Sequence, residues 1–330
     1  MPDEVTLSAA AAGELAVKAC LNVGASQASA RSLADATISA MLYGPSMLGF
    51  PHLVDYLNSF REGRIKGDPT PVLGNAYPAF LVSDADQGIA QLGFDRAFDK
   101  LVKAARTHGI AIFTQTNSYT VGELGYYVRR LADEHIIALA SSNANAMVTP
   151  QAGGPAVYGT NPLAFGFPLG DGSPPLLIDQ ASSATAYINL VRAAAEKQPI
   201  PEGWAVDENG MATSDPVKAL AGALLPFGGR KGGNVALLVE MLSAGLSGGP
   251  WSLDTADFTS GSASPAVGLT IIAIMPGRDD GRLEERAQKQ ADRLIDLDIF
   301  VPGISGTRAC ADALKIPRDV FETVQRFAQG

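Results

Sequence analysis

The sequence predicts an α/β fold in which helices cover a mixed β-sheet. Three observations support this prediction. In the middle of the 330-residue chain, short apolar runs of strand length alternate with helical patterns, as they do in βαβ units. Apolar residues make up 46% of the chain, which is enough for a sizeable core. Residues 1–65 and the tail from Val301 show mainly helical and loop patterns.

Three helices are expected in residues 1–65. Gly24 and Gly44 follow Ala- and Leu-rich stretches and are typical of helix ends. After Pro51, apolar residues recur at helical spacing up to Gly63. The next segment, residues 66–78, is rich in Pro and Gly and is expected to form a linker.

The middle of the chain carries the expected sheet. Its predicted strands are Ala79–Ser83, Ile110–Thr114, Ile136–Ser141, Leu163–Phe167, Leu176–Asp179 and Val267–Met275. Its predicted helices lie at 91–108, 122–134, 184–197, 231–245 and 282–297. The early alternation of strands and helices favours a partly parallel sheet. The next two strands are close together, which favours a hairpin or meander, and residues 247–265 are expected to be a loop.

The tail, Val301–Gly330, is expected to fold back on the N-terminal helices. This predicts a discontinuous helical domain made of residues 1–70 and 300–330. Residues 71–299 would form the α/β domain.

Charge and composition exclude several classes of protein. The chain has 25 basic and 34 acidic side chains and a net charge of −9, which argues against a nucleic-acid partner. The longest apolar run, Val267–Met275, is too short to span a membrane, and no basic segment precedes the first apolar run. We therefore expect a cytoplasmic protein. Two cysteines and three histidines without ligand spacing predict no metal site.

The common nucleotide and hydrolase motifs do not fit. The chain lacks GxGxxG and GxxxxGK[ST], so neither an ordinary Rossmann phosphate turn nor a Walker A loop is expected. A GxSxG pattern occurs at Gly245–Gly249, but the preceding Leu237–Ala244 has a helical pattern. A nucleophile elbow needs a strand there, so the hydrolase interpretation is disfavoured.

Seven segments taken together resemble the malate/L-lactate dehydrogenase family, which is unrelated to the Rossmann dehydrogenases and includes Δ1-piperideine-2-carboxylate reductase, ureidoglycolate dehydrogenase and 2,3-diketogulonate reductase. In chain order they are Tyr56–Ile65 (YLNSFREGRI), Asn117–Tyr127 (NSYTVGELGYY), Gly159–Pro162 (GTNP), Ile178–Ser183 (IDQASS), Pro201–Trp204 (PEGW), Leu224–Gly232 (LLPFGGRKG) and Pro302–Gly303. Each is weak alone, but their common order and spacing make the resemblance specific. It covers nearly the whole chain.

The resemblance implies a central mixed sheet, a homodimer, a small-molecule substrate and hydride transfer with NADPH or NADH bound by the α/β domain. The residues that it places along the cofactor are Thr160, Ile178, Asp179, Gln180, Ala181, Ser182, Ser183, Arg230, Lys231, Pro302, Gly303 and Ile304.

Elementary chemistry is compatible with this placement. Asp179 ends an apolar run, where open α/β sheets bind ligands, although it could instead cap the following helix. Ser182 and Ser183 begin a helical pattern, and helix N-termini attract phosphate. Arg230 and Lys231 add positive charge in a glycine loop and slightly favour NADPH, although they could instead lie in a solvated turn.

The chain departs from the family at its polar site positions. Met47-Leu48-Gly49 stands where the family has Ser-His-Gly, so Leu48 replaces the catalytic histidine. His52 replaces a substrate-binding arginine, and Thr120 replaces a further histidine. Ile304 stands in place of a glutamate. Met47, Leu48, Tyr119 and Thr120 are the expected substrate-pocket residues.

These losses favour reduction of C=N. A ketone needs a positioned acid when it is reduced, and leucine has no proton to give. A cyclic imine can arrive protonated, and Asp179 could stabilise its positive charge. We therefore expect a reductase of a Δ1-piperideine-2-carboxylate-like imino acid, or of a 2-oxo acid. His52, four residues after Leu48, and Tyr119 are alternative proton donors.

Two other interpretations stay open. The loss of arginine at position 52 favours a divergent reductase of a biosynthetic imine or ketone without the usual carboxylate recognition. A non-catalytic cofactor-binding or scaffold protein is the third interpretation, because fold does not imply function. Binding of NADH or NADPH separates it from the first two.

Overall fold

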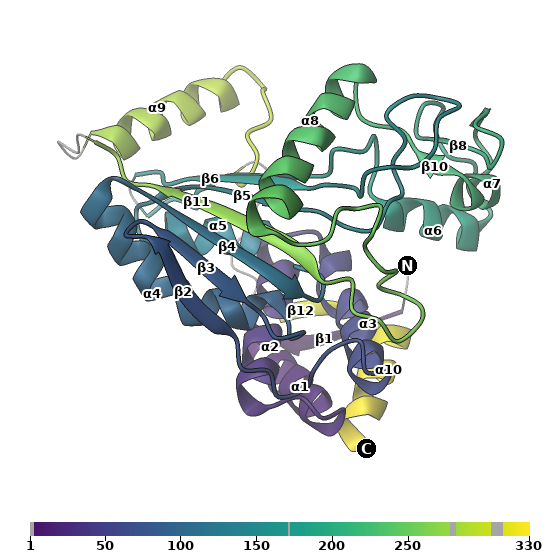
Figure 1. Cartoon of the computed structure of the whole chain (residues 1–330), viewed down its shortest axis with the longest axis horizontal. Helices are drawn as coiled ribbons and strands as arrows, with labels where there is room; N and C mark the ends of the chain where they lie inside the picture. Colours follow the sequence, from purple (N-terminus) through teal and green to yellow (C-terminus); the bar gives the residue numbers. More distant parts are fainter. Residues whose placement is uncertain (1–2, 171, 278–281, 305–312) are drawn as a thin grey trace.

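In the computed structural model, which describes residues 3–170, 172–277, 282–304 and 313–330, a central mixed sheet is flanked by helices. A helical unit formed by the two ends of the chain lies beside the sheet, and a smaller lobe, within residues 187–224, lies at one end of the sheet (Figure 1). The predicted α/β class is confirmed. Within the described ranges, no helix is both long and apolar enough to cross a membrane.

The central sheet has seven strands among the described residues. In spatial order they are β2 (Val72–Tyr77), β3 (Phe80–Asp84), β4 (Ile110–Ser118), β11 (Val267–Ile274), β5 (Ile137–Ser142), β6 (Leu163–Phe167) and β7 (Leu176–Gln180). Only β3 and β4 are parallel neighbours in this sheet as described; the other pairs are antiparallel.

The sheet corrects two expectations and confirms a third. β11 lies between β4 and β5, antiparallel to both. The strands β4 and β5, expected to be neighbours in a βαβ unit, are therefore not paired with each other. Residues 66–78 are not simply a linker, because β2 forms there and pairs with β3 at the sheet edge. The expected meander is β5–β6–β7.

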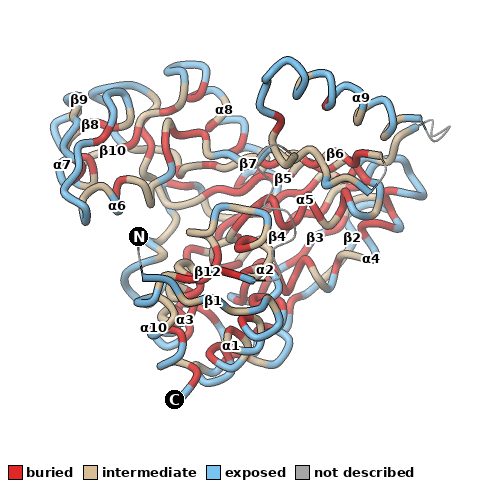
Figure 2. The backbone as a smooth tube through the Cα atoms, turned by 180° about the vertical axis from the view of Figure 1, so that it is seen from behind, coloured by how far each residue is buried: buried red, intermediate tan, exposed pale blue. Residues whose placement is uncertain are grey.

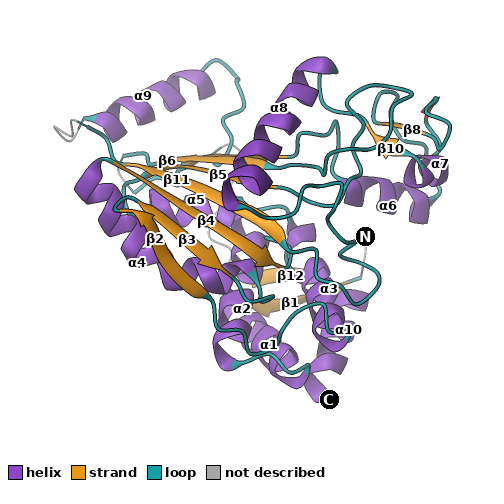
Figure 3. Cartoon of the chain, in the orientation of Figure 1, coloured by secondary structure: helices purple, strands orange, loops and turns teal. Residues whose placement is uncertain are grey.

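Helices cover both faces of the sheet (Figure 3). α4 (Ala90–His108) and α5 (Gly125–Ala132) pack on one face. α8 (Arg230–Glu240) and the π-helical turn η2 (Met241–Gly245) pack on the other. The buried layer between the sheet and α4–α5, which includes Phe94, Leu101, Phe113, Tyr127 and Ile271, is the red interior in Figure 2.

The two ends of the chain pack together. The three expected N-terminal helices are α1 (Ala9–Asn22), α2 (Gln27–Tyr43) and α3 (Phe50–Arg61), and α10 (Arg318–Gln329) packs on α1 and α3. A short 3-10 turn, η1 (Ser46–Leu48), joins α2 to α3. An unpredicted strand, β1 (Glu4–Ser8), pairs antiparallel with β12 (Ala313–Pro317). The exact division at 1–70, 71–299 and 300–330 stays a prediction.

The smaller lobe was not predicted as a unit. It contains α6 (Tyr187–Glu196), β8 (Ala205–Val206), β9 (Ala212–Thr213), α7 (Pro216–Ala221) and β10 (Ala223–Leu224). Its three short strands form a separate sheet, and Val148, Leu190 and Leu224 belong to its own apolar cluster. The remaining helix, α9 (Leu283–Ile295), is largely exposed (Figure 2).

Candidate active site

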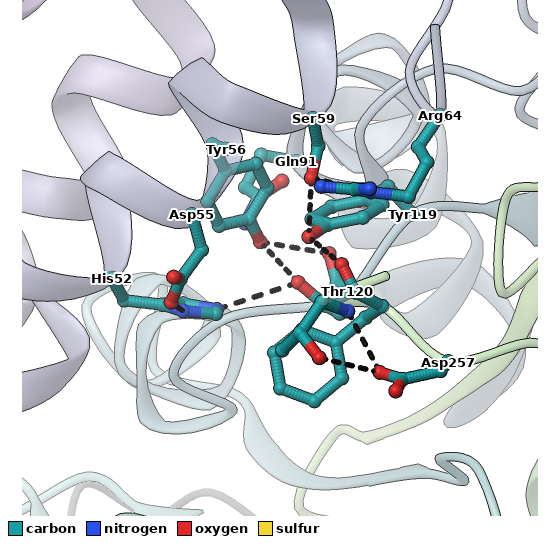
Figure 4. A network of polar contacts seen from close by, with 11 residues as sticks. His52, Asp55, Tyr56, Ser59, Arg64, Gln91, Tyr119, Thr120 and Asp257 are labelled. Atoms are coloured by element: carbon teal, nitrogen blue, oxygen red, sulfur yellow. Dashed lines mark hydrogen bonds and ion pairs between the residues drawn. The ribbon is translucent and has the colours of Figure 1, made fainter. Parts of the chain in front are cut away.

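A loop between β4 and α5, residues 119–124, organises the candidate site. Its Thr120 faces His52, which α3 presents in its first turn (Figure 4). Tyr56 lies one helical turn after His52, and its hydroxyl donates to the Thr120 carbonyl at 2.8 Å. The helical unit and the sheet domain therefore meet at this loop.

His52 has polar partners on both ring nitrogens. Nδ1 lies 2.8 Å from Asp55 Oδ2, and Nε2 lies 3.4 Å from Thr120 Oγ1. The Thr120 hydroxyl is in turn 3.0 Å from the Tyr56 hydroxyl. The His52 side chain is 14% exposed and that of Asp55 is 45% exposed, so the pair reaches solvent from the Asp55 side.

A buried hydrogen-bond network holds the loop on α3. Gln91 Nε2 donates to the Tyr56 hydroxyl at 3.2 Å and to the Val121 carbonyl at 3.0 Å. Burial raises the pKa of Tyr56 to about 12, so this phenol stays protonated and acts as a fixed donor at neutral pH.

Tyr119 does not fit its predicted place in the substrate pocket. Its side chain has no exposed surface, and its hydroxyl accepts a hydrogen bond from Ser59 and donates to the Phe258 carbonyl at 2.9 Å. Burial also raises the pKa of Tyr119 well above its usual value. Tyr119 is therefore a packing residue that links the loop around Phe258 to α3. Its hydroxyl proton is engaged in the hydrogen bond to the Phe258 carbonyl.

Met47 and Leu48 lie in η1 and are partly buried. Gly49 separates this turn from α3, so Leu48 and His52, although four residues apart, do not lie on the same helix. His52 belongs to α3, and Leu48 ends the preceding turn. Both apolar side chains nevertheless come from the segment that leads directly into His52.

Asp179 lies in β7, as predicted, but its helix partner was not foreseen. Its Oδ2 accepts a hydrogen bond from Gly125 N–H at 2.8 Å, at the N-terminus of α5, whereas α6 begins only at Tyr187. Burial raises the pKa of Asp179 to about 7, and the neighbouring Glu123 carboxylate contributes to this rise. This carboxyl can therefore change charge near neutral pH.

Glu123 and Arg129 form a buried ion pair next to Asp179. Arg129 donates to Glu123 Oε1 at 2.9 Å, and their side chains are 11% and 1% exposed, respectively. The other Glu123 oxygen is buried without a hydrogen-bond partner among the described residues. Loop 119–124 thus links the His52 network at one end to this acidic cluster at the other.

Several predicted cofactor residues come together through their backbones. Ser182 N–H donates to the Thr160 carbonyl at 2.8 Å, and Phe227 N–H donates to the Ser182 carbonyl at 3.1 Å. The Phe227 segment leads into α8, whose first residues are Arg230 and Lys231. Both of these cations are exposed.

The serines do not begin a helix, which corrects the prediction for Ser182 and Ser183. Both side chains are buried, and their hydroxyls donate to the carbonyls of Asn161 and Thr185 at 2.6 and 2.7 Å. These bonds shape the segment before α6. The remaining predicted stretch, Pro302–Ile304, lies beside β7, where the Pro302 carbonyl accepts from Leu177 N–H at 3.0 Å.

A cavity of about 170 Å³ was not predicted from the sequence. It is lined by Tyr187 and Leu190 of the lobe and by Asp257 and Phe258 of the loop before β11. Asn145, from the segment after β5, also lines it. The Phe258 ring centroid is 6.4 Å from that of His52. Its position between the cavity and His52 makes Phe258 a shared wall of the two.

The cavity carries polar groups that accept hydrogen bonds. Asn145 Oδ1 is buried and has no partner among the described residues. Although partial burial raises the pKa of Asp257, hydrogen bonds from Thr259 and Ser260 bring it below its ordinary value. A ring with an N–H donor suits this cavity, whereas a whole dinucleotide exceeds its volume. The polar cluster NAN after β5 was the only sequence signal for this site.

The cavity and the polar network lie where structural units meet, which is a common place for small-molecule sites. The chain belongs to the malate/L-lactate dehydrogenase family, whose model matches residues 7–314. The predicted family and its mixed-sheet fold are therefore confirmed. The expected class of activity, an NAD(P)H-dependent oxidoreductase, is confirmed with them.

Three similar proteins place the chain within this family. A Δ1-pyrroline-2-carboxylate/Δ1-piperideine-2-carboxylate reductase from Pseudomonas putida is 35% identical over 83% of this chain and 80% of its own length. A (2R)-3-sulfolactate dehydrogenase (NADP(+)) from Chromohalobacter salexigens is 33% identical over 95% of each chain. The crystal structure of Δ1-piperideine-2-carboxylate reductase from Pseudomonas syringae pv. tomato has a TM-score of 0.91 and 31% identity, covering 98% of this chain and 99% of that one.

Proposed function

We propose that this chain is an NADPH- or NADH-dependent reductase that delivers hydride to the C=N bond of a cyclic imino acid similar to Δ1-piperideine-2-carboxylate. The C=O bond of a 2-oxo acid is the second acceptor in this proposal. Relatives named for cyclic imino acids and for sulfolactate support both acceptor classes. We also place the protein in the cytoplasm.

The observation that carries this proposal is the apolar pair Met47 and Leu48. They occupy the turn that leads into His52, where the family resemblance puts an acid. A ketone becomes an alkoxide on reduction and needs that acid, whereas a protonated imine becomes a neutral amine. The apolar turn therefore favours an acceptor that carries its own positive charge.

Asp179 supports the same acceptor. Its pKa of about 7 makes a substantial fraction of this carboxyl ionised at neutral pH, and a fixed negative charge stabilises an iminium ion. The backbone N–H of Gly125 holds the carboxylate in place. We assign Asp179 the role of electrostatic partner for the iminium nitrogen.

The residues fit a nicotinamide cofactor at two places. The first turn of α8 follows Gly228 and Gly229, which adopt positive φ values of 56° and 63°, and it has no side-chain cap among the described residues. Its free amides together with Arg230 and Lys231 would hold phosphate. Asn145 Oδ1 would accept the carboxamide N–H. The bound dihydronicotinamide would supply the hydride.

Replacing Lys231 with methionine is expected to weaken NADPH binding about tenfold, because one cation at a phosphate-binding helix terminus is removed. NADH binding should weaken less if this lysine faces the additional phosphate. Fluorescence titration measures both affinities. Lys289→Met, on the exposed face of α9, is the matched control. Equal NADPH affinity in all three proteins would contradict the proposed phosphate site.

A substrate panel tests the reaction itself. We expect kcat/KM for Δ1-piperideine-2-carboxylate to exceed that for pyruvate about 100-fold or more, because the apolar turn supplies no proton to a ketone. Steady-state oxidation of NADPH measures both values. Normal efficiency with lactate or malate, together with no imine reduction, would contradict the proposal.

A divergent reductase without carboxylate recognition is the second candidate. One observation favours it: the Asp55 carboxylate lies 2.8 Å from His52, where the family has its substrate-binding arginine, and it would repel a substrate carboxylate. Adding Δ1-piperideine, which lacks the carboxylate, to the panel separates the two candidates.

We further propose a homodimer. Exposed apolar side chains are concentrated on α8 and the segment after it, namely Leu237, Leu238, Met241, Trp251 and Leu253. Large exposed apolar side chains of this kind are common at subunit interfaces.

A further inference from the structure

We infer that Asp55 and His52 form a pair that protonates the imine nitrogen before hydride transfer, a step that a ketone cannot share because its oxygen is too weakly basic. Asp55 is the positioning residue, and His52 Nε2 is the atom that gives up the proton. This inference rests on the proposed imine reductase and deepens it, because it supplies a proton to substrate that arrives as the neutral imine.

The Asp55 contact sets the tautomer of His52. An ionised carboxylate only accepts hydrogen bonds, so the 2.8 Å contact requires a proton on Nδ1. In a neutral ring the proton is then on Nδ1, and Nε2 carries the lone pair. Any second proton that His52 binds or releases therefore belongs to Nε2.

The network beyond Nε2 accommodates that second proton. The Tyr56 hydroxyl donates its single proton to the Thr120 carbonyl, and it accepts from Gln91 Nε2 and from the Thr120 hydroxyl. Because the Thr120 hydroxyl donates its hydrogen bond to Tyr56, its Oγ1 presents a lone pair to His52 Nε2 at 3.4 Å. Each of these hydrogen bonds therefore has one donor and one acceptor when His52 Nε2 carries a proton.

The hydrogen bond between His52 Nε2 and Thr120 is also the one that a substrate can replace most easily. At 3.4 Å it is the longest of the hydrogen bonds around His52 and Thr120, and long hydrogen bonds are weak. A substrate nitrogen can replace Thr120 as the acceptor at little cost. His52 is also next to the proposed ring cavity, because its ring contacts Phe258.

The proton and electron balance is simple. The Nε2–H bond breaks as an N–H bond forms on the imine nitrogen, which leaves His52 neutral on the Nδ1–H tautomer. The resulting iminium carbon is then ready to accept the hydride, and with it the two electrons, that a bound dihydronicotinamide would supply. Solvent returns a proton to His52, since Asp55 keeps the pair partly exposed.

Other groups around His52 do not compete for this role. Tyr56 on the same helix is a buried phenol whose pKa is raised to about 12. On the loop that packs against His52, Phe258 does not titrate, and the Asp257 carboxylate is bound by Thr259 and Ser260. Thr120, from the third packed segment, does not titrate either.

The test combines a spectrum with kinetics. In ¹⁵N-histidine-labelled protein at high pH, the His52 ring should show the Nδ1–H tautomer. Asp55→Ala should lose that preference, Asp55→Glu should restore it at least in part, and Asn58→Ala on the same helix should leave it unchanged. His52→Gln identifies the signal among the three histidines.

In imine reduction, His52→Gln should lower kcat about 100-fold with little change in KM. Asp55→Ala should lower it about tenfold. An Nε2–H tautomer in the unaltered protein, or full kcat in His52→Gln at high pH, where free imine predominates, would overturn the inference while leaving the proposed reductase intact. Failure of the unaltered protein to reduce any imine would overturn the proposed function, and the tautomer would still test the Asp55 contact.

Discussion

Asp179→Asn is expected to raise the midpoint of thermal unfolding at pH 8 and to slow imine reduction about 100-fold. The pKa of Asp179 in the folded protein is about 7, above its usual 3.8, so the folded state binds this proton more tightly than the unfolded state does. The stability associated with the protonated carboxyl is complete below pH 3.8 and is lost as the pH rises through 7. Asparagine resembles the protonated form and should be more stable at pH 8 by about 2 kcal/mol.

The kinetic loss has a separate cause, because asparagine carries no charge to stabilise an iminium ion. Thermal unfolding at pH 5 and pH 8 and steady-state kinetics measure the two effects. The stability difference should shrink at the lower pH. Asp68→Asn, at an exposed position, should change neither. A variant that loses stability at pH 8 would refute the assigned direction of the pKa shift.

Arg129→Met is expected to destabilise the fold by about 3–5 kcal/mol, because it leaves the Glu123 carboxylate buried without its partner. The Glu123 side chain is 1% exposed, so water cannot replace the lost guanidinium. Arg129 also donates to Ser39 at 2.6 Å and covers the Tyr43 ring at 4.8 Å, which anchors α2 to α5. Urea denaturation measures the loss.

Two further variants show whether the buried charge is responsible. Arg129→Met combined with Glu123→Gln should recover part of the stability, because the neutral amide is cheaper to bury than a carboxylate. Lys289→Met breaks an exposed ion pair with Glu285 and should cost less than about 0.5 kcal/mol. If the free energy of unfolding of Arg129→Met alone lies within about 1 kcal/mol of that of the unaltered protein, the prediction is wrong.

The strongest elements of the fold could be predicted from local patterns. Apolar runs such as Ile110–Thr114 and Val267–Met275 are central strands, and the helical spacing at 91–108 corresponds to α4. β1 and β2 were missed because they are edge strands with alternating or mainly exposed residues. The position of β11 between β4 and β5 depends on pairing between distant segments, which local periodicity does not reveal.

The candidate site was predictable as a set of segments but not as a geometry. Family resemblance named His52, Thr120 and Asp179, and the structure gives each of them a polar contact. It did not name Asp55 or Gln91, whose importance comes only from the hydrogen bonds they make. The alternative role for Asp179 was to cap the next helix in sequence, yet its carboxylate accepts from the N-terminus of a helix that begins 54 residues earlier.

The antiparallel pairing of β1 with β12 has a consequence for biosynthesis. Residues 4–8 leave the ribosome long before their strand partner, which emerges only after more than three hundred further residues have been made. Helices α1–α3 keep an open apolar face until α10 has been made, so a segment translated much later closes the unit that carries His52. A truncated nascent chain would thus lack both a finished core and an assembled proton donor.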